Sequence, residues 1–253
     1  MLLEGKVILV TGGTGGRVGP GICRALARHG GTVAINCFTS QDKANTLSQS
    51  FAEQGWTAKV WQCDVRDTAA VKRMVEDIVT TFGRIDGVVN NATNGGQWQG
   101  WDPADWHHFT DCFESEVKMA LNTIHAARPF MRKQGGGRIV NIVSEQWIRG
   151  SDGHTPYVTA LGARIGMSRW LVHDLAADNI TMNMVSPEAT RDVRPRVKPL
   201  EERTDYERSI PLQRIADAEE IGDACAFFIS DLAKFISGAY LPVGGGHHPR
   251  MGS

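Results

Sequence analysis

Short apolar runs recur along the chain and alternate with segments that have helical spacing. Strands buried on both faces of a sheet are continuously apolar, and neighbouring parallel strands need a crossover that is usually a helix. The crossover at 68–82 fits this pattern, because its apolar residues repeat at helical intervals before Gly83. Seven runs have strand character, at 6–12, 32–38, 58–65, 85–92, 138–144, 180–187 and 239–245. The alternation predicts one α/β domain over 1–253, with a doubly wound, seven-stranded parallel sheet and helices on both faces.

The composition argues against several classes of protein. The formal net charge is −1, which gives no reason to expect a nucleic acid or an acidic membrane as a partner. No apolar run approaches the roughly 18–20 residues that span a bilayer, and the first residues read as a strand rather than a signal peptide. The five cysteines are scattered, and none forms a C-x-x-C pair. These features favour a cytoplasmic protein with reduced thiols.

Two histidine pairs, His107-His108 and His247-His248, are the remaining candidates for metal ligands. Adjacent residues on a helix or a strand point in different directions, so neither pair is expected to converge on one ion. We therefore predict no metal site.

A glycine-rich loop follows the first run directly and opens a helical segment, TGGTGGRVGPGICRALA at 11–27. In a strand–loop–helix unit, such a loop lets backbone N–H groups approach a pyrophosphate, and the helix N-terminus adds partial positive charge. Counting back from Gly30 makes Gly19 the last glycine position and makes the loop about one residue longer than usual. A glycine turn without a ligand is the alternative. The predicted cofactor contacts are Gly12, Thr14, Gly16, Arg17, Val18 and Gly19.

The end of the second run favours NADP(H) over NAD(H). An acidic residue about 20 residues beyond the glycine loop would bind the ribose 2′-hydroxyl of NAD. The sequence there, CFTS at 37–40, carries no carboxylate. Thr39 and Ser40, with Lys43 and Arg17 nearby in the sequence, are the candidates to bind a 2′-phosphate instead.

The order of these features resembles the short-chain dehydrogenase/reductase family over nearly the whole chain. TGGTGGRVG resembles its T-G-x-x-x-G-x-G loop, VVNNAT its N-N-A-G motif, and SPEATRD its P-G turn. Tyr157 follows Ser144 by thirteen residues, which matches the family's Ser–Tyr spacing, and the segment from Pro211 onward follows its C-terminal segment. The resemblance implies a Rossmann fold and further cofactor contacts from Asp64, Val65, Asn90, Asn91, Ala92 and Pro187.

The resemblance also implies a chemistry, which is hydride transfer between a nicotinamide and a carbonyl or alcohol carbon. In the family, the Tyr exchanges the hydroxyl proton, the Ser polarises the substrate oxygen, a Lys four residues after the Tyr lowers the Tyr pKa, and an Asn holds a water in the proton relay. Tyr157 and Ser144 match two of these positions. The other two depart, because Leu161 stands where the Lys is expected and Glu116 aligns with the Asn.

Three interpretations of the missing lysine are open. Arg164, seven residues after Tyr157 and on nearly the same helix face, could supply the cation, at a spacing that resembles the enoyl-carrier-protein reductase branch; the alternative is a surface or subunit-interface ion pair. Glu116 could be the general acid or base of an isomerase, dehydratase or cyclase on the same fold; the alternative is a solvated helix residue. The protein could also be a non-catalytic homologue.

The substrate side is less defined by the sequence. Trp98, Trp147 and His154 are predicted to border the pocket, which suits a small, aromatic substrate; packing anchors and an exposed histidine are the alternatives. The charged segment 188–212 lies after a strand's carboxyl end, where ligands bind in such sheets, and is predicted to be a substrate lid. An ordinary surface loop is the alternative. The resemblance implies a homodimer or homotetramer.

The sequence therefore predicts a reductase of a carbonyl or activated alkene that uses NADP(H) and a non-standard site. Tyr157 would donate the proton, Ser144 would hydrogen-bond the substrate oxygen, and Arg164 or Glu116 would cover part of the lysine's role. Because an unperturbed tyrosine has a pKa of about 10, Tyr157 without a lysine is expected to be a neutral proton donor and a poor base. That state favours reduction over oxidation.

Overall fold

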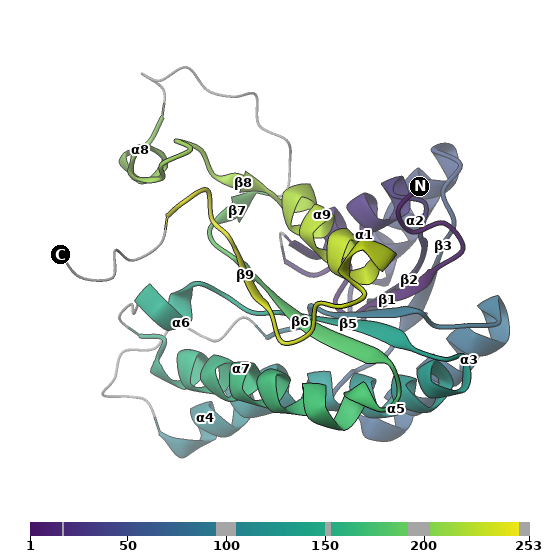
Figure 1. Ribbon diagram of the computed structural model, residues 1–253. Helices are drawn as coiled ribbons and strands as arrows, with labels where there is room; N and C mark the ends of the chain where they lie inside the picture. Colours follow the sequence, from purple (N-terminus) through teal and green to yellow (C-terminus); the bar gives the residue numbers. More distant parts are fainter. Residues whose placement is uncertain (17, 95–104, 150–152, 192–202, 248–253) are drawn as a thin grey trace.

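The structure is a computed structural model (Figure 1) that describes residues 1–16, 18–94, 105–149, 153–191 and 203–247. Two of the predicted site residues, Arg17 and Trp98, lie outside the described residues, as does the middle of the predicted lid.

Seven parallel strands form the main sheet, in the order β3-β2-β1-β4-β5-β6-β9. Each apolar run of the sequence contains one of them, which confirms the predicted seven-stranded α/β fold. The strands are β1 (Val7–Val10), β2 (Thr32–Cys37), β3 (Ala58–Gln62), β4 (Gly87–Asn90), β5 (Gly137–Ile142), β6 (Ile180–Pro187) and β9 (Tyr240–Val243). A second sheet pairs β7 (Thr190–Arg191) with β8 (Ala216–Asp217). These two-residue strands have no periodicity, so the sequence did not predict them.

Helices cover both faces of the sheet, as Figure 1 shows. On one face, α1 (Val18–Arg28), α2 (Gln41–Glu53) and α9 (Ala218–Ile229) contribute to one apolar core layer. On the other face, α3 (Thr68–Phe82), α5 (Met119–Lys133) and α7 (Thr155–Ala176) contribute to a second layer. The remaining helical segments are α4 (Trp106–Phe113), a π-helix (Glu114–Lys118), α6 (Gln146–Arg149), α8 (Asp205–Ser209) and a 3₁₀-helix (Asp231–Ala233).

The strand order reverses next to β1, which pairs with β2 on one side and with β4 on the other. In open α/β sheets the connections on the two sides of such a point diverge and leave a crevice outside the carboxyl ends of the strands. The loop that precedes α1 and the residues that follow β4 therefore meet at this crevice.

Small residues let α1 and α9 approach each other closely. A Cβ on Gly21 would lie 2.3 Å from the Cβ of Ala218, and a Cβ on Gly222 would lie 2.5 Å from that of Ala25. This contact fixes α1, the helix whose N-terminus faces the crevice.

No helix in the described part of the chain is long and apolar enough to cross a membrane. All five cysteines are buried, and none forms a disulfide in the structure.

We expect Gly21→Ala to lower the free energy of unfolding by about 1–2 kcal/mol, because overpacking of about 1–3 kcal/mol outweighs the gain of up to about 1 kcal/mol in helix propensity. The control is Gly162→Ala on α7, where an added Cβ meets nothing within 4 Å. In Gly162→Ala only the higher helix propensity of alanine acts, so the free energy of unfolding should rise. Urea titrations of the two variants measure both values, and equal effects would contradict the close contact.

Candidate functional site

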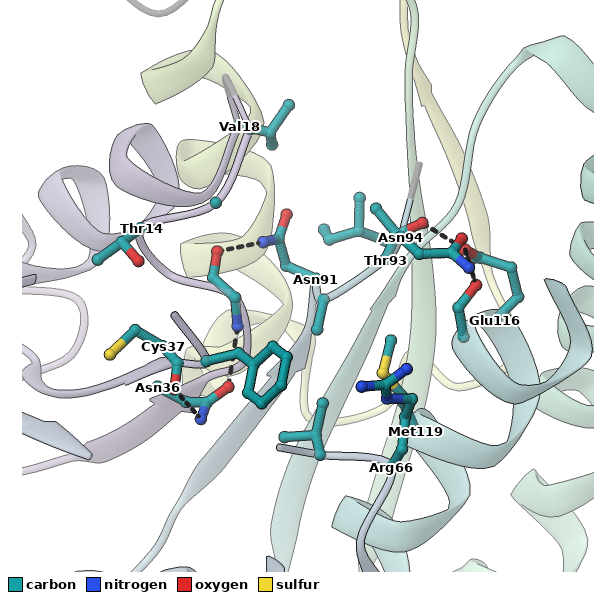
Figure 2. Close-up of a pocket in the computed structure, with 18 of the residues that line it drawn as sticks. Thr14, Val18, Asn36, Cys37, Arg66, Asn91, Thr93, Asn94, Glu116 and Met119 are labelled. Atoms are coloured by element: carbon teal, nitrogen blue, oxygen red, sulfur yellow. Dashed lines mark hydrogen bonds between the residues drawn. The ribbon is translucent and has the colours of Figure 1, made fainter. Parts of the chain in front are cut away.

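A cavity of about 800 Å³ lies at the carboxyl ends of the central strands (Figure 2). It reaches from the glycine loop, past the ends of β2, β3 and β4, to the region of Ser144 and Tyr157. Most of the predicted site residues line it: Gly12, Thr14, Gly16, Val18, Thr39, Ser40, Asp64, Val65, Asn91, Ala92, Glu116, Ser144, Tyr157, Arg164 and Pro187. The structure thus brings them together in one cavity, although their roles stay predictions.

Side chains at the ends of neighbouring strands hydrogen-bond the backbone of the glycine loop and fix its position beside the cavity. Asn36 accepts a hydrogen bond from the Gly12 N–H at 3.1 Å, and the Asn91 amide donates to the Gly12 carbonyl at 3.0 Å (Figure 2). Gly12 and Gly16 have φ values of +59° and +60°, which glycine adopts without strain. Gly19 does not line the cavity, but a Cβ there would lie 2.3 Å from the Gly12 carbonyl oxygen. The loop and the start of α1 therefore fit a dinucleotide pyrophosphate.

Asn90, another predicted cofactor contact, lies behind the cavity wall rather than on it. Its amide donates to Asn141 at 2.8 Å, and its side-chain oxygen accepts from Thr123 at 2.5 Å. Its backbone carbonyl accepts a 2.6 Å hydrogen bond from Arg164. Asn90 thus positions the end of β4 and one catalytic candidate.

Arg164 and Glu116 form a buried ion pair beside the cavity. The Arg164 Nη1 donates to Glu116 Oε2 at 3.0 Å, and both side chains are at most 2% exposed. The other carboxylate oxygen accepts from Thr93 at 2.5 Å, which Figure 2 shows, and from Ser115 at 3.2 Å. Because both side chains are buried within the chain, the structure rules out a surface or subunit-interface ion pair for Arg164 and a solvated helix residue for Glu116.

The π-helix explains how Glu116 turns inward. Two adjacent residues of this π-helix, Ser115 and Glu116, are both buried. A π-turn widens the helix locally and is frequent at functional sites. Sequence spacing based on a regular helix could not predict this local geometry.

Leu161 leaves the expected lysine position apolar. It is fully buried and packs with Val143, Ile165 and Met184, with Tyr157 against the same cluster. The Leu161 side chain therefore supplies neither a charge nor a hydrogen-bond donor one helical turn after Tyr157. Arg164, two turns along α7, provides a buried cation instead.

The environment of Tyr157 keeps its phenol protonated. Burial raises its pKa well above the ordinary value, and the negative charge of Glu116 raises that pKa further. Arg164 and a hydrogen bond with the Ser144 hydroxyl act in the opposite direction but do not cancel the increase. Tyr157 can donate a proton over a wide pH range, and it is a poor base.

The predicted substrate residues are placed less directly. Trp147 is not among the residues lining the cavity; its indole N–H donates to the Tyr240 hydroxyl at 2.6 Å. His154 also does not line the cavity, although its ring centroid lies 6.4 Å from that of Tyr157. A substrate role for these two residues stays a prediction.

Four charged residues on the cavity wall had no role in the sequence prediction: Arg66, Asp111, Glu114 and Glu188. Arg66 pairs with Asp64 through Nε and Nη2, and its guanidinium carbon lies 5.5 Å from the Phe38 ring centroid. Glu188 stands in the P-G turn and accepts a 2.9 Å hydrogen bond from Tyr206 of α8. The contact of Arg66 with Phe38 joins segments that are far apart in the sequence, which no spacing rule links.

The start of α4 corrects the argument about adjacent histidines. The ligand atoms of Asp105, His107 and His108 lie within 4.8 Å of one another, so the pair does converge. Capping accounts for this cluster, because Asp105 accepts from the His107 N–H at 3.0 Å and its own N–H donates to His108 at 3.1 Å.

Comparisons with known proteins place the chain among oxidoreductases. The family model described as Enoyl-(Acyl carrier protein) reductase matches residues 16–248. Nodulation protein G of Azospirillum brasilense is 31% identical over 252 residues, which cover 95% of this chain and 97% of that protein. The 3-oxoacyl-(acyl-carrier-protein) reductase FabG of Escherichia coli strain K12 is 32% identical over 248 residues, with 97% of this chain and 98% of that protein covered.

Solved structures agree with these relatives. A 7 alpha-hydroxysteroid dehydrogenase complexed with NADH and 7-oxo glycochenodeoxycholic acid superposes with a TM-score of 0.86 at 26% identity, covering 99% of this chain and 97% of that one. A short-chain dehydrogenase/reductase from Serratia marcescens BCRC 10948 also gives a TM-score of 0.86, at 27% identity, covering 98% and 100%. The fold, the extent of the sequence match and these relatives confirm the resemblance, and the chain belongs to the short-chain dehydrogenase/reductase family.

Proposed function

We propose that this protein is an NADP(H)-dependent reductase of a carbonyl or activated alkene in a small-molecule substrate. One observation carries the proposal: a single cavity joins the glycine loop to Ser144 and to a protonated Tyr157. The relatives support the reaction class, since one is named a 3-oxoacyl-(acyl-carrier-protein) reductase and another was solved with NADH and a 7-oxo compound. The same kinship supports a homodimer or homotetramer and a cytoplasmic location.

NADP(H) is the proposed cofactor because the cavity offers hydroxyl groups and no acid where β2 ends. Thr39 and Ser40 line the cavity there, directly after Cys37 and Phe38. A carboxylate at this point would select NAD through its 2′-hydroxyl and repel a 2′-phosphate. When bound, the cofactor supplies the hydride.

The protein's part in the reaction is proton transfer and charge stabilisation. Tyr157 donates its hydroxyl proton to the substrate oxygen as negative charge develops there, and the Ser144 hydroxyl hydrogen-bonds the same oxygen. Arg164 stabilises the phenolate that remains, because its fixed positive charge opposes the burial that raises the Tyr157 pKa. Glu116 holds Arg164 in place and is not the proton donor.

The bonding of Glu116 disfavours the alternative of a non-redox isomerase, dehydratase or cyclase. A general base needs a free carboxylate oxygen directed at the substrate. Here one oxygen accepts from Thr93 and Ser115, and the other accepts from Arg164. The arrangement suits a carboxylate that positions a cation. A non-catalytic role has less support because Ser144 and Tyr157 share the cavity with the glycine loop.

The segment 188–212 remains our proposed substrate lid. In its described part, the Tyr206 hydroxyl donates to Glu188 on the cavity wall, and Arg149 of α6 pairs with the same carboxylate at 3.2 Å. These bonds connect α8 to the wall of the cavity beyond Pro187.

Replacing Tyr157 by Phe should remove the proton donor and leave the cofactor site intact. We expect NADPH-dependent reduction of a carbonyl panel to fall by about 10²–10⁴-fold, the usual contribution of general acid catalysis. The dissociation constant for NADPH, measured by fluorescence titration, should stay within about twofold because no cofactor contact is lost. Unchanged turnover would refute the proton-donor role.

The rate of reduction should depend weakly on pH. A proton donor is present below its pKa and lost above it, and the Tyr157 pKa is raised. We therefore expect kcat/KM for reduction to stay level between about pH 6 and about pH 9. In Leu161→Lys, a cation one helical turn from Tyr157 lowers the Tyr157 pKa. The decrease of kcat/KM at high pH should therefore begin at a lower pH than in wild type. Leu161→Met is the control of similar volume, and a shift in that variant too would show that packing is responsible.

The ion pair gives a test that separates stability from catalysis. Because Arg164 and Glu116 are buried, Arg164→Met and Glu116→Met should each cost about 3–5 kcal/mol by leaving one unpaired charge, and the double variant should cost less than either. Urea unfolding measures these values. The double variant should recover stability while turnover stays about tenfold or more below wild type, because the cation that stabilises the phenolate formed on Tyr157 is gone. Recovery of both would mean that the pair serves folding alone.

A further inference from the structure

We infer that Arg66 is the residue that selects the 2′-phosphate of NADP(H). The inference rests on the proposed NADP(H) function and names a recognition residue that no sequence motif indicated. Three observations carry it: the position of the guanidinium beside the end of β2, the donors that its ion pair leaves available, and the charges around it.

The position comes from a contact between two strand ends. Phe38 follows the last residue of β2, and Arg66 lies four residues beyond the end of β3. The guanidinium carbon lies 5.5 Å from the Phe38 ring centroid, within the range of a cation–π contact. Both residues line the cavity with Thr39 and Ser40. The end of β2 is where a dinucleotide fold binds the adenosine ribose, so the guanidinium would lie near the 2′ position of a bound nucleotide.

The ion pair of Arg66 orients it without using all of its donors. Nε and Nη2 donate to Asp64 at 2.7 to 3.1 Å, so one edge of the guanidinium faces that carboxylate. The hydrogen bonds described for Arg66 leave Nη1 unused. The Arg66 side chain is 49% exposed, so an incoming phosphate can reach it. A planar guanidinium with a fixed edge and further donors suits a phosphate oxygen.

The surrounding charges make Arg66 necessary for binding an anion. Asp64, Asp111 and Glu114 line the same part of the cavity, and Lys118 pairs with Glu114 at 2.8 Å. Without Arg66, these four residues would carry a net negative charge and would repel a 2′-phosphate. The only other cation among the described residues lining the cavity is Arg164, whose charge is matched by Glu116. Arg66 reduces the net negative charge at the adenosine end.

The test compares nucleotides that differ only in the 2′-phosphate. Dissociation constants for NADPH, NADH, adenosine 2′,5′-bisphosphate and 5′-AMP are measured by calorimetry in wild type, Arg66→Gln, Arg66→Lys and Arg73→Gln. Arg73 is exposed on α3 and does not line the cavity, so its variant controls for a lost surface charge. Arg66→Gln should weaken NADPH and the bisphosphate by tenfold or more, as about 1.4 kcal/mol of charge-assisted bonding requires. NADH and 5′-AMP should change by less than about twofold.

The outcomes separate this inference from the proposed function. If Arg66 only supports the fold around Asp64, Arg66→Gln weakens all four nucleotides equally, and the inference is wrong. If wild type prefers NADPH and Arg66→Gln keeps that preference, the inference is wrong but the proposed cofactor stands. If wild type prefers NADH or binds no nucleotide, the proposed cofactor fails and the inference fails with it. Arg66→Lys keeps the charge but loses the planar guanidinium. A preference for NADPH over NADH between those of wild type and Arg66→Gln would support the inference.

Discussion

The buried ion pair between Arg164 and Glu116 is the interaction on which the rest of the site depends. Burying two charges costs several kcal/mol for each ion, and only good geometry with further hydrogen bonds recovers that cost. Here the carboxylate also accepts from Thr93 and Ser115, and the guanidinium also donates to the Asn90 carbonyl. The Arg164 Nε is left without a partner among the described residues, so the compensation is incomplete. The pair ties α7 to the π-helix and to the end of β4.

That connection gives a physical reason for four unusual residues in one site. Leu161 removes the cation one turn from Tyr157 and completes an apolar cluster. Arg164 restores a cation from two turns along the helix, and Glu116 balances it inside the protein. Thr93, which stands where the resembled motif has glycine, donates a hydrogen bond to the Glu116 carboxylate. The departures from the family pattern are therefore connected by contact, and together they leave Tyr157 beside a neutralised pair instead of a free lysine.

The sequence predicted most of the fold and only part of the site, for different reasons. Buried parallel strands such as β4 and β6 are continuously apolar, so they can be recognised locally. Ser144 and Tyr157 could be identified because their spacing matches a family pattern. Arg164 and Glu116 were candidates, but their contact spans 48 residues and depends on a π-turn, so their burial and pairing could not be predicted. The same is true of Arg66 and Phe38, which meet only because β2 and β3 are neighbours.

The central claim is that Tyr157 is held protonated beside a neutralised ion pair, and a direct titration of its phenol tests it. The chain has three tyrosines, and burial raises the pKa of the other two, Tyr206 and Tyr240, to about 12. With ¹³C-labelled tyrosine, NMR resolves each phenol, and Tyr157→Phe assigns the signal. We predict that the Tyr157 signal keeps the chemical shift of a neutral phenol through about pH 10, the ordinary tyrosine pKa. A titration midpoint below that value would contradict the account, since it would show that the site stabilises a phenolate as a lysine would.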